Sequence, residues 1–222
     1  MTKKLRAIIT GSTGMVGEGV LIECLNHPDV EKVLVINRKP CGYTHPKLKE
    51  VIHANFFNLQ PIADQLTGYN ACFFCAGITS LGKSKEEYYH FTYNMTMAVA
   101  QVLVDANPDM VFCYVSGAST DSTEQGSLAW ARVKGKVEND LMKMSFREVY
   151  NFRPSFMLPT KGMKYAQPFY KYINWLFPVL KVVAPNSVST LREQALAMIN
   201  APLKGYDKQI LEVPDIKKLA AK

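Results

Sequence analysis

The sequence predicts a doubly wound α/β fold with a parallel sheet, and three observations support that prediction. Short apolar runs that suit buried strands alternate along the chain with amphipathic stretches whose apolar residues recur at helical spacing. A glycine-rich turn joins the first apolar run to the first amphipathic stretch. Small or polar residues follow several of the apolar runs, and ligands in open parallel sheets bind at these carboxyl ends of strands.

The expected elements alternate between strands and helices, which predicts right-handed crossovers between parallel strands. Strands are expected at residues 7–9, 32–36, 49–53, 70–76, 110–115, 149–152 and 210–213. Helices are expected at residues 16–25, 85–107, 127–144 and 189–200, the last capped by Ser189 or Thr190.

The glycine-rich turn carries the first functional signal, because Gly11, Gly14 and Gly17 fall at regular spacing between the first strand and the first helix. In such a turn the first glycine allows a sharp reversal, and the second lets the backbone approach a pyrophosphate. The third lets helix and strand pack closely. Free amides and the dipole at the helix start favour an anion. The context predicts a dinucleotide-binding turn, with an ordinary structural turn as the alternative.

The end of the second strand indicates which dinucleotide is preferred. A carboxylate there bonds to the adenosine ribose in NAD-binding folds, whereas an arginine accommodates the extra phosphate of NADP. Arg38 and Lys39 follow this strand, while Glu31 precedes it, at the wrong end to act as that carboxylate. The basic pair favours NADP over NAD, because guanidinium and phosphate groups are complementary. A solvated basic turn is the alternative.

Two further segments supply expected cofactor contacts. Asn55 and Phe56 lie in the loop after the third strand, which suits an adenine ring. The fourth strand ends in Cys75, Ala76 and Gly77, where small residues let a ligand approach the backbone.

Composition and charge narrow the class of protein. The 222 residues are 48% hydrophobic and 20% charged, which suits a single folded domain over residues 1–222. No apolar run approaches the roughly 20 residues that span a bilayer, and the apolar stretch near the basic N-terminus is too short for a signal peptide. A cytoplasmic protein without a transmembrane segment is therefore expected. The net charge of +7 is spread along the chain, so a small-molecule substrate is expected and a nucleic-acid partner is not.

The cysteines predict reduced thiols rather than a disulfide framework. Their number, 5, is odd, and most of them lie in apolar runs. Cys72 and Cys75 have the spacing of a metal or redox pair, but side chains three residues apart on a strand point to opposite faces. No metal site is therefore expected.

Four motifs, in this order, resemble the short-chain dehydrogenase/reductase superfamily, at its atypical, epimerase/dehydratase-like branch near the Tat-interacting-protein-like reductases. They are residues 10–17 (TGSTGMVG), 114–119 (YVSGAS), 130–136 (WARVKGK) and 152–154 (FRP). The resemblance covers residues 4 to about 159 and, more loosely, the rest of the chain. It implies a Rossmann-like fold that binds NADP, with NAD possible. The expected cofactor contacts are Gly11, Ser12, Thr13, Gly14, Met15, Val16, Arg38, Asn55, Phe56, Cys75, Ala76, Gly77, Lys134 and Pro154.

The resemblance also implies a catalytic set, from which one member is missing. Relatives usually carry a serine after the fifth strand and a Tyr-x-x-x-Lys helix, in which the lysine binds the nicotinamide ribose and lowers the pKa of the tyrosine. Lys134 is in place, and Ser116 or Ser119 matches the serine. Trp130 occupies the tyrosine position, and its indole N–H can position a ligand but does not ionise at physiological pH. Simple packing or capping of the nicotinamide pocket is the alternative role for Trp130.

Two functional hypotheses follow from this pattern. In the first, the chain is an NADP(H)-binding reductase or epimerase that moves a hydride between nicotinamide and a carbonyl or sugar-like carbon, with Ser116 and Lys134 in support. In the second, the chain has lost catalysis and acts as a cofactor-bound regulatory or interaction protein. The intact lysine and serine favour the first hypothesis, and Trp130 favours the second.

The last third of the chain, residues 160–222, is expected to form a small C-terminal helical cap over the substrate or an interface. Residues 165–184 are rich in aromatic residues and leucines. A lid or a partner interface is favoured over a segment lying on a membrane, because the lysines there are too few for strong binding to anionic lipid. The tail from Lys217 is expected to be solvated.

Overall fold

A computed structural model describes residues 4–160, 162–166 and 177–222. The strands are β1 (Leu5–Thr10), β2 (Val30–Asn37), β3 (Leu48–Ile52), β4 (Ala71–Phe74), β5 (Val111–Val115), β6 (Glu148–Arg153), β7 (Phe156–Leu158), β8 (Val188–Thr190) and β9 (Ile210–Glu212). The α-helices are α1 (Met15–Asn26), α2 (Lys85–Tyr89), α3 (Met95–Ala106), α4 (Ala129–Leu141), α6 (Phe177–Val183), α7 (Leu191–Lys204) and α8 (Val213–Ala220). A 3₁₀ helix, η1, spans Gln60–Leu66, and a short π-helix, η2, spans His90–Asn94.

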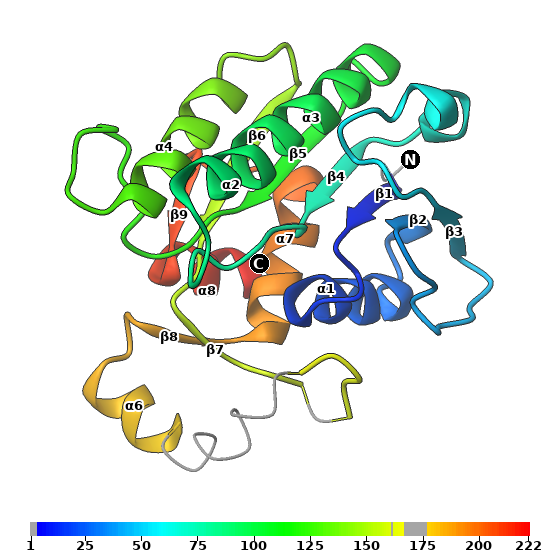
Figure 1. The fold of residues 1–222 in the computed structure, drawn as a ribbon. Coiled ribbons are helices and arrows are strands. Elements are labelled where there is room, and N and C mark those ends of the chain that lie inside the picture. Colours follow the sequence, from blue (N-terminus) through cyan, green and yellow to red (C-terminus); the bar gives the residue numbers. More distant parts are fainter. Residues whose placement is uncertain (1–3, 161, 167–176) are drawn as a thin grey trace.

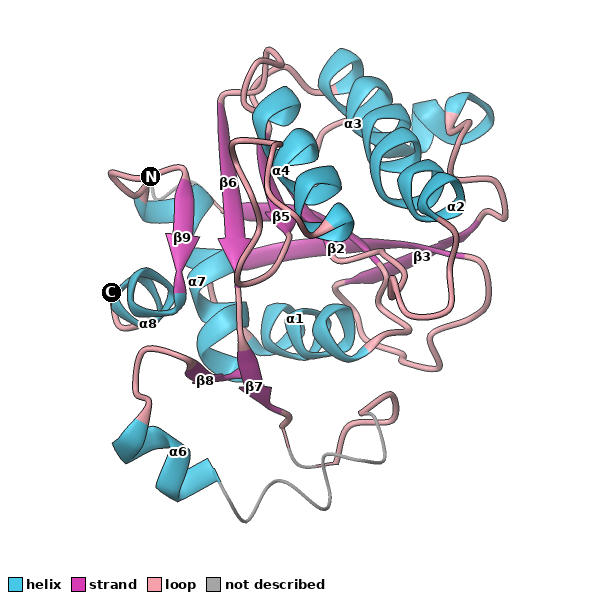
Figure 2. Cartoon of the chain, turned by 60° about the vertical axis from the view of Figure 1, so that its left-hand side comes forward, coloured by secondary structure: helices cyan, strands magenta, loops and turns pink. Residues whose placement is uncertain are grey.

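Among the described residues, seven strands form one sheet in the order β3-β2-β1-β4-β5-β6-β9, and every pair in it is parallel (Figures 1 and 2). The predicted doubly wound fold is therefore confirmed. Strand order reverses at β1, because β2 pairs with one of its edges and β4 with the other. A crevice opens at such a reversal, outside the carboxyl ends of the strands, and it is the usual ligand site in this architecture.

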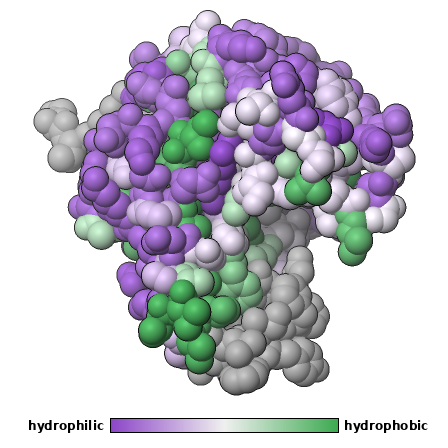
Figure 3. Space-filling model, turned by 90° about the vertical axis from the view of Figure 1, so that its left-hand side faces the viewer, coloured by the Kyte–Doolittle hydropathy of each residue, from purple (hydrophilic) through white to green (hydrophobic). Residues whose placement is uncertain are grey.

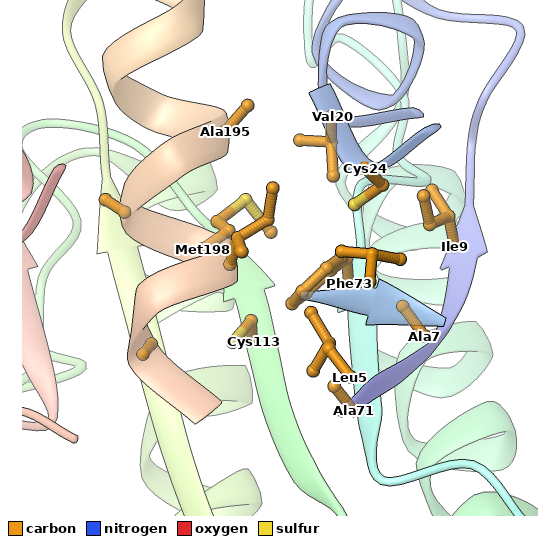
Figure 4. Packing of buried hydrophobic residues seen from close by; sticks show 14 of the residues in the cluster. Leu5, Ala7, Ile9, Val20, Cys24, Ala71, Phe73, Cys113, Ala195 and Met198 are labelled. Atoms are coloured by element: carbon orange, nitrogen blue, oxygen red, sulfur yellow. The ribbon is translucent and has the colours of Figure 1, made fainter. Parts of the chain in front are cut away.

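Two layers of helices cover the sheet, and strand alternation assigns side chains to them. Ile9 and Phe73 pack with α1 and α7 on one face (Figure 4), and α8 belongs to the same cluster. Their neighbours Ile8 and Phe74 pack with η1, α3 and α4 on the other face. All four side chains are fully buried, as in a parallel sheet covered on both faces.

The long helix expected at residues 85–107 is interrupted. Five residues, His90–Asn94, form a π-helical segment between α2 and α3. A π-helical segment, or π-bulge, adds one residue to a turn of the helix and is frequent at functional sites. Apolar periodicity continues across the insertion, and the sequence therefore gives no sign of it.

The C-terminal third of the chain divides into two parts. Strand β9 joins the main sheet, and α7 packs beside α1 in one helical layer. The expectation of a solvated tail is wrong, because Leu219 of α8 is fully buried. Strands β7 and β8 form a separate two-stranded ribbon that lies with α6 away from the main sheet (Figures 1 and 2). The capping residue of α7 is Thr190, whose side chain accepts from the Glu193 amide.

The aromatic segment expected at residues 165–184 lies partly outside the described residues, which exclude 167–176. Its last part, α6, exposes Val179, Val182 and Val183. Figure 3 shows a strongly apolar patch at the lower end of the molecule, the end at which α6 lies in Figure 1. Within the described part of the chain, none of the helices has the length and hydropathy needed to span a bilayer.

Candidate functional site

The glycine turn has the geometry that its spacing predicts. Gly11 has a φ of +73°, and a Cβ placed on it would lie 2.7 Å from the backbone at Cys75 and Ala76. A Cβ on Gly17 would lie 2.2 Å from the Gly11 carbonyl oxygen. The turn closes through the Gly14 amide, which donates to the Gly11 carbonyl at 2.9 Å. Glycine is thus required for backbone conformation at Gly11 and for close packing at Gly17.

The turn opens into a cleft of about 240 Å³ at the carboxyl ends of β1, β2 and β4. Eight of the predicted cofactor residues line it: Gly11, Thr13, Gly14, Arg38, Phe56, Cys75, Ala76 and Gly77. The cleft also has a lining that sequence reasoning missed: Ile36, Asn37, Ala54, Phe57, Ile78, Phe91 and Met95. Phe91 and Met95 belong to the helical stripe of residues 85–107, so the sequence indicates only that they are apolar.

Six predicted cofactor residues lie outside the lining of this cleft: Ser12, Met15, Val16, Asn55, Lys134 and Pro154. Ser12 is fully buried, and its hydroxyl donates to Asn37 Oδ1 at 2.9 Å. Asn55 is exposed, and its side chain accepts from the Phe57 amide. The Pro154 carbonyl accepts from the Ala118 amide, which joins the chain beyond β6 to the loop after β5.

Lys134 and Ser116 meet at the carboxyl end of β5. The Lys134 ammonium donates to the Ser116 carbonyl oxygen. The Ser116 hydroxyl donates to Glu138 Oε1 at 2.5 Å, and its oxygen lies 3.1 Å from the Phe152 carbonyl oxygen. Arg153 completes the cluster, because its guanidinium donates to both carboxylate oxygens of Glu138. The resulting ion pair is buried, with Glu138 fully inaccessible and Arg153 9% exposed.

The environment of Lys134 changes its ionisation. Burial lowers the pKa of its ammonium to about 8, and the nearby Glu138 carboxylate partly opposes that shift. The lysine is thus less strongly charged near neutral pH than a solvated lysine. Glu138 and Arg153 were not among the predicted site residues, and only the Phe-Arg-Pro motif pointed to this end of β6.

The two remaining candidates do not join this cluster. Trp130 is half-buried in the first turn of α4 and does not line the cleft. Ser119 is exposed and has a φ of +65°. Ser116 is therefore the serine that contacts the Lys134 region, although its hydroxyl already has a carboxylate partner.

A buried carboxylate ties the last third of the chain to the start of α1. Glu18 is fully buried and accepts from the backbone amides of Lys164 and Tyr165, at 2.6 and 2.7 Å. It also accepts from the Tyr43 hydroxyl at 2.5 Å. Burial of the phenol and, after it, this contact raise the pKa of Tyr43. The contacts bring residues 162–166 beside the helix that follows the glycine turn.

These residues fit a nicotinamide dinucleotide. Helix α1 begins at Met15, and its N-cap residue, Gly14, makes no side-chain hydrogen bond to the first amides of the helix. Gly11 and Gly14, which line the cleft, leave room for a diphosphate at that end. Apolar and aromatic side chains line the part of the cleft near Phe56 and Phe57, which suits an adenine ring. Within the described residues, no group of His, Cys, Asp or Glu side chains forms a metal site.

Fold and cleft together define a Rossmann-type protein that binds nicotinamide dinucleotides. The chain belongs to the NAD dependent epimerase/dehydratase family, whose model matches residues 7–127. It is 25% identical to the Aspergillus terreus protein named fmp52-1, mitochondrial, over 69% of this chain and 67% of that protein. It is 25% identical to the Aspergillus oryzae protein of the same name, over 67% of this chain and 64% of that protein. The matched region thus spans about two thirds of these relatives.

Solved structures share the fold at low sequence identity. The Bordetella bronchiseptica enzyme WbmF in complex with NAD+ superposes with a TM-score of 0.66 at 13% identity, over 99% of this chain and 77% of that one. A Burkholderia cenocepacia short chain dehydrogenase in complex with NADP gives a TM-score of 0.64 at 16% identity, over 100% of this chain and 94% of that one. The two structures contain different dinucleotides, and at these identities they show that the fold is shared.

The names of the relatives correct one expectation. The two Aspergillus proteins and a relative from Meyerozyma guilliermondii, 23% identical over 69% of this chain and 66% of that protein, are all named as mitochondrial. This finding contradicts the cytoplasmic location expected from the sequence. Neither composition nor the N-terminal pattern indicated it.

Proposed function

We propose that this chain is an NADP(H)-preferring reductase or epimerase-like protein that acts on a carbonyl or sugar-like small molecule. The observation that carries the proposal is the cleft at the β1, β2 and β4 ends, which combines an uncapped helix start with Arg38. The helix start suits a diphosphate, and the guanidinium suits the additional phosphate of NADP.

Each part of the site has a distinct task in this proposal. Gly11, Gly14 and the first amides of α1 hold the diphosphate, and Phe56 packs against the adenine. Lys134 of α4, whose ammonium reaches the residue after β5, donates to the ribose hydroxyls next to the nicotinamide. When bound, the cofactor supplies or accepts the hydride.

The proton must reach the substrate oxygen without the usual tyrosine. Trp130 cannot supply it, because an indole does not ionise at physiological pH. Ser116 can donate a hydrogen bond to that oxygen only after its hydroxyl leaves Glu138, which it contacts at 2.5 Å. The remaining source is water or a hydroxyl of the substrate itself.

The second candidate function is a cofactor-bound regulatory or interaction protein without catalysis. Two observations favour it: Trp130 replaces the acid/base residue, and the Ser116 hydroxyl is held by a carboxylate that is fully buried. Both functions need the same cleft, so cofactor binding supports both and only turnover separates them.

Cofactor binding is tested by titrating the fluorescence of NADPH and of NADH with the purified protein. We expect saturable binding, with NADPH bound about tenfold more tightly, which is the effect of one charge-assisted hydrogen bond. Arg38→Ala should remove this preference. Lys39→Ala is the matched control, because Lys39 is exposed and does not line the cleft. Failure of the wild-type protein to bind either dinucleotide would overturn the proposed function.

Catalysis is tested with Trp130→Tyr and a panel of carbonyl substrates. The new phenol lies one helical turn before Lys134, on the same face of α4. We expect it to raise turnover at least tenfold, in line with the usual contribution of a positioned acid or base. If the wild-type protein already turns over at the rate of the variant, the tryptophan is not the limiting feature. If neither turns over while both bind NADPH, the regulatory function is favoured.

A further inference from the structure

A single carboxylate oxygen holds both ends of the basic turn after β2. Glu50 Oε1, on the neighbouring strand β3, accepts from the side-chain Nδ2 of Asn37 at 2.8 Å. The same oxygen accepts from the backbone amide of Cys41, also at 2.8 Å. Asn37 and Cys41 flank Arg38, Lys39 and Pro40, so the position of this turn depends on Glu50.

These contacts also fix the orientation of the Asn37 amide. Because Glu50 Oε1 accepts twice, Asn37 must present its NH₂ group to that oxygen. Its Oδ1 then faces Ser12, whose hydroxyl donates to it at 2.9 Å. Asn37 is 2% exposed and Ser12 fully buried, so the hydrogen bond between them is shielded from water, whereas Glu50 is half-buried.

The series of hydrogen bonds from Ser12 through Asn37 to Glu50 restricts which residue can end β2. A carboxylate at position 37 would face Glu50 across 2.8 Å, which two negative charges do not tolerate. Asn37 uses one Nδ2 hydrogen on Glu50 and one Oδ1 lone pair on Ser12, and its amide carries no charge to offer to ribose hydroxyls. The exposed Arg38 is therefore the first side chain after β2 that is free to contact a dinucleotide in the cleft.

From this geometry we propose that Glu50 determines which nicotinamide dinucleotide the cleft prefers. It keeps the end of β2 uncharged through Asn37, and it clamps the turn that presents Arg38. Glu50 is a positioning residue, since it does not line the cleft. The inference rests on the proposed function and assigns its cofactor selectivity to a residue on a different strand.

The first test exchanges the charges of the pair. In Asn37→Asp/Glu50→Gln, the amide introduced on β3 can donate to the carboxylate introduced at the end of β2, where that carboxylate accepts from ribose hydroxyls. We expect the ratio of the dissociation constants, NADH over NADPH, to fall about tenfold in fluorescence titrations. Asn186→Asp/Glu31→Gln is the matched control: it makes the same substitutions at exposed sites and should leave the ratio unchanged.

The second test keeps Asn37 and compares two substitutions at position 50, so it does not depend on the folding of the double variant. Glu50→Gln retains an oxygen that accepts from Asn37 and Cys41, and it should keep the wild-type preference for NADPH. Glu50→Leu removes both contacts and should lower the NADH over NADPH ratio about fivefold, the effect of one hydrogen bond. Thermal melting of each variant establishes that it is folded.

The outcomes separate this inference from the proposed function. If the wild-type protein binds neither dinucleotide, the proposed function fails. If it prefers NADPH and the folded exchange variant keeps that preference, Glu50 does not set selectivity, and the proposed function stands. Equal ratios for Glu50→Gln and Glu50→Leu would likewise overturn the inference. The inference is supported if the NADH over NADPH ratio falls in the exchange variant and in Glu50→Leu but stays at the wild-type value in Glu50→Gln.

Discussion

Two parts of the sheet's carboxyl edge differ in whether their polar groups are open to a ligand or bonded within the protein. At the ends of β1, β2 and β4, Gly11, Gly14 and Arg38 line an open cleft. At the ends of β5 and β6, Ser116 and Arg153 instead converge on Glu138 inside the protein. The first region is available to a ligand, whereas the groups of the second region already have protein partners. A motif match therefore shows that a residue type is present, while the structure shows whether its polar atoms are free.

The largest effect that sharpens this contrast is expected at Arg153. Arg153→Leu leaves the fully buried Glu138 without its cationic partner. The free energy of unfolding should fall by about 3–5 kcal/mol, the usual cost of an uncompensated buried charge, as measured by urea denaturation.

Arg192→Leu is the matched control for that measurement. Its side chain is 69% exposed and lies 3.7 Å from Glu23. The same substitution there should cost about 1 kcal/mol or less, because exposed ion pairs contribute little. Equal losses in the two variants would contradict the assignment of the Glu138 cluster as a closed, buried network.

The next effect concerns the open region. Gly17→Ala places a Cβ 2.2 Å from the Gly11 carbonyl, so the glycine turn must shift. We expect a loss of about 2–3 kcal/mol in the free energy of unfolding, typical of overpacking, together with weakened NADPH binding. Gly77→Ala is the control for stability, since its Cβ would meet no atom within 4 Å. If both variants melt together with the wild-type protein, close packing at Gly17 does not hold the turn.

Much of this open region could be predicted, because local sequence dictates it. Apolar runs indicated the strands, and the spacing of Gly11, Gly14 and Gly17 indicated a turn whose conformation only glycine tolerates. Arg38 and Gly77 followed from their places directly after strands. These signals involve residues close together in the chain, where periodicity and backbone preference are informative.

The closed region could not be predicted in the same way. The contacts between Ser116, Glu138 and Arg153 join residues on β5, α4 and β6. Their pairing depends on strand order and helix rotation, which residue spacing does not reveal. Ser12 and Leu219 show the same limit of sequence-based prediction. Ser12 is a polar residue of the turn, yet it is buried and bonds to Asn37 of β2. Leu219 lies in the tail, yet it is buried because α8 packs against α7.

Stability at alkaline pH offers a third way to compare the two regions. Burial lowers the Lys134 pKa to about 8, whereas a lysine in the unfolded chain titrates near 10.4. Between these values the unfolded state binds more protons, so this group makes the protein more stable as pH rises. Relative to Lys134→Met, the wild-type protein should therefore gain about 2 kcal/mol between pH 7.5 and 9.5 in urea denaturation.

The exposed Lys218 provides the reference for that pH dependence. The difference between the wild-type protein and Lys218→Met should stay constant over the same pH range, because this side chain is exposed in the folded protein. Comparing differences also cancels the tyrosines and cysteines that titrate in this range. A constant difference for Lys134→Met as well would show that its ammonium is solvated.

The smallest effect is expected at Trp130, and it tests where the boundary between the two regions lies. Trp130 does not line the cleft, so Trp130→Phe should change the NADPH dissociation constant by less than about twofold. Phe57 lines the cleft and stacks on His90, with their ring centroids 4.2 Å apart. Phe57→Leu should weaken binding about fivefold through lost aromatic contact. A larger loss for Trp130→Phe than for Phe57→Leu would place the tryptophan against the bound dinucleotide, and the position of the missing tyrosine would then belong to the open region.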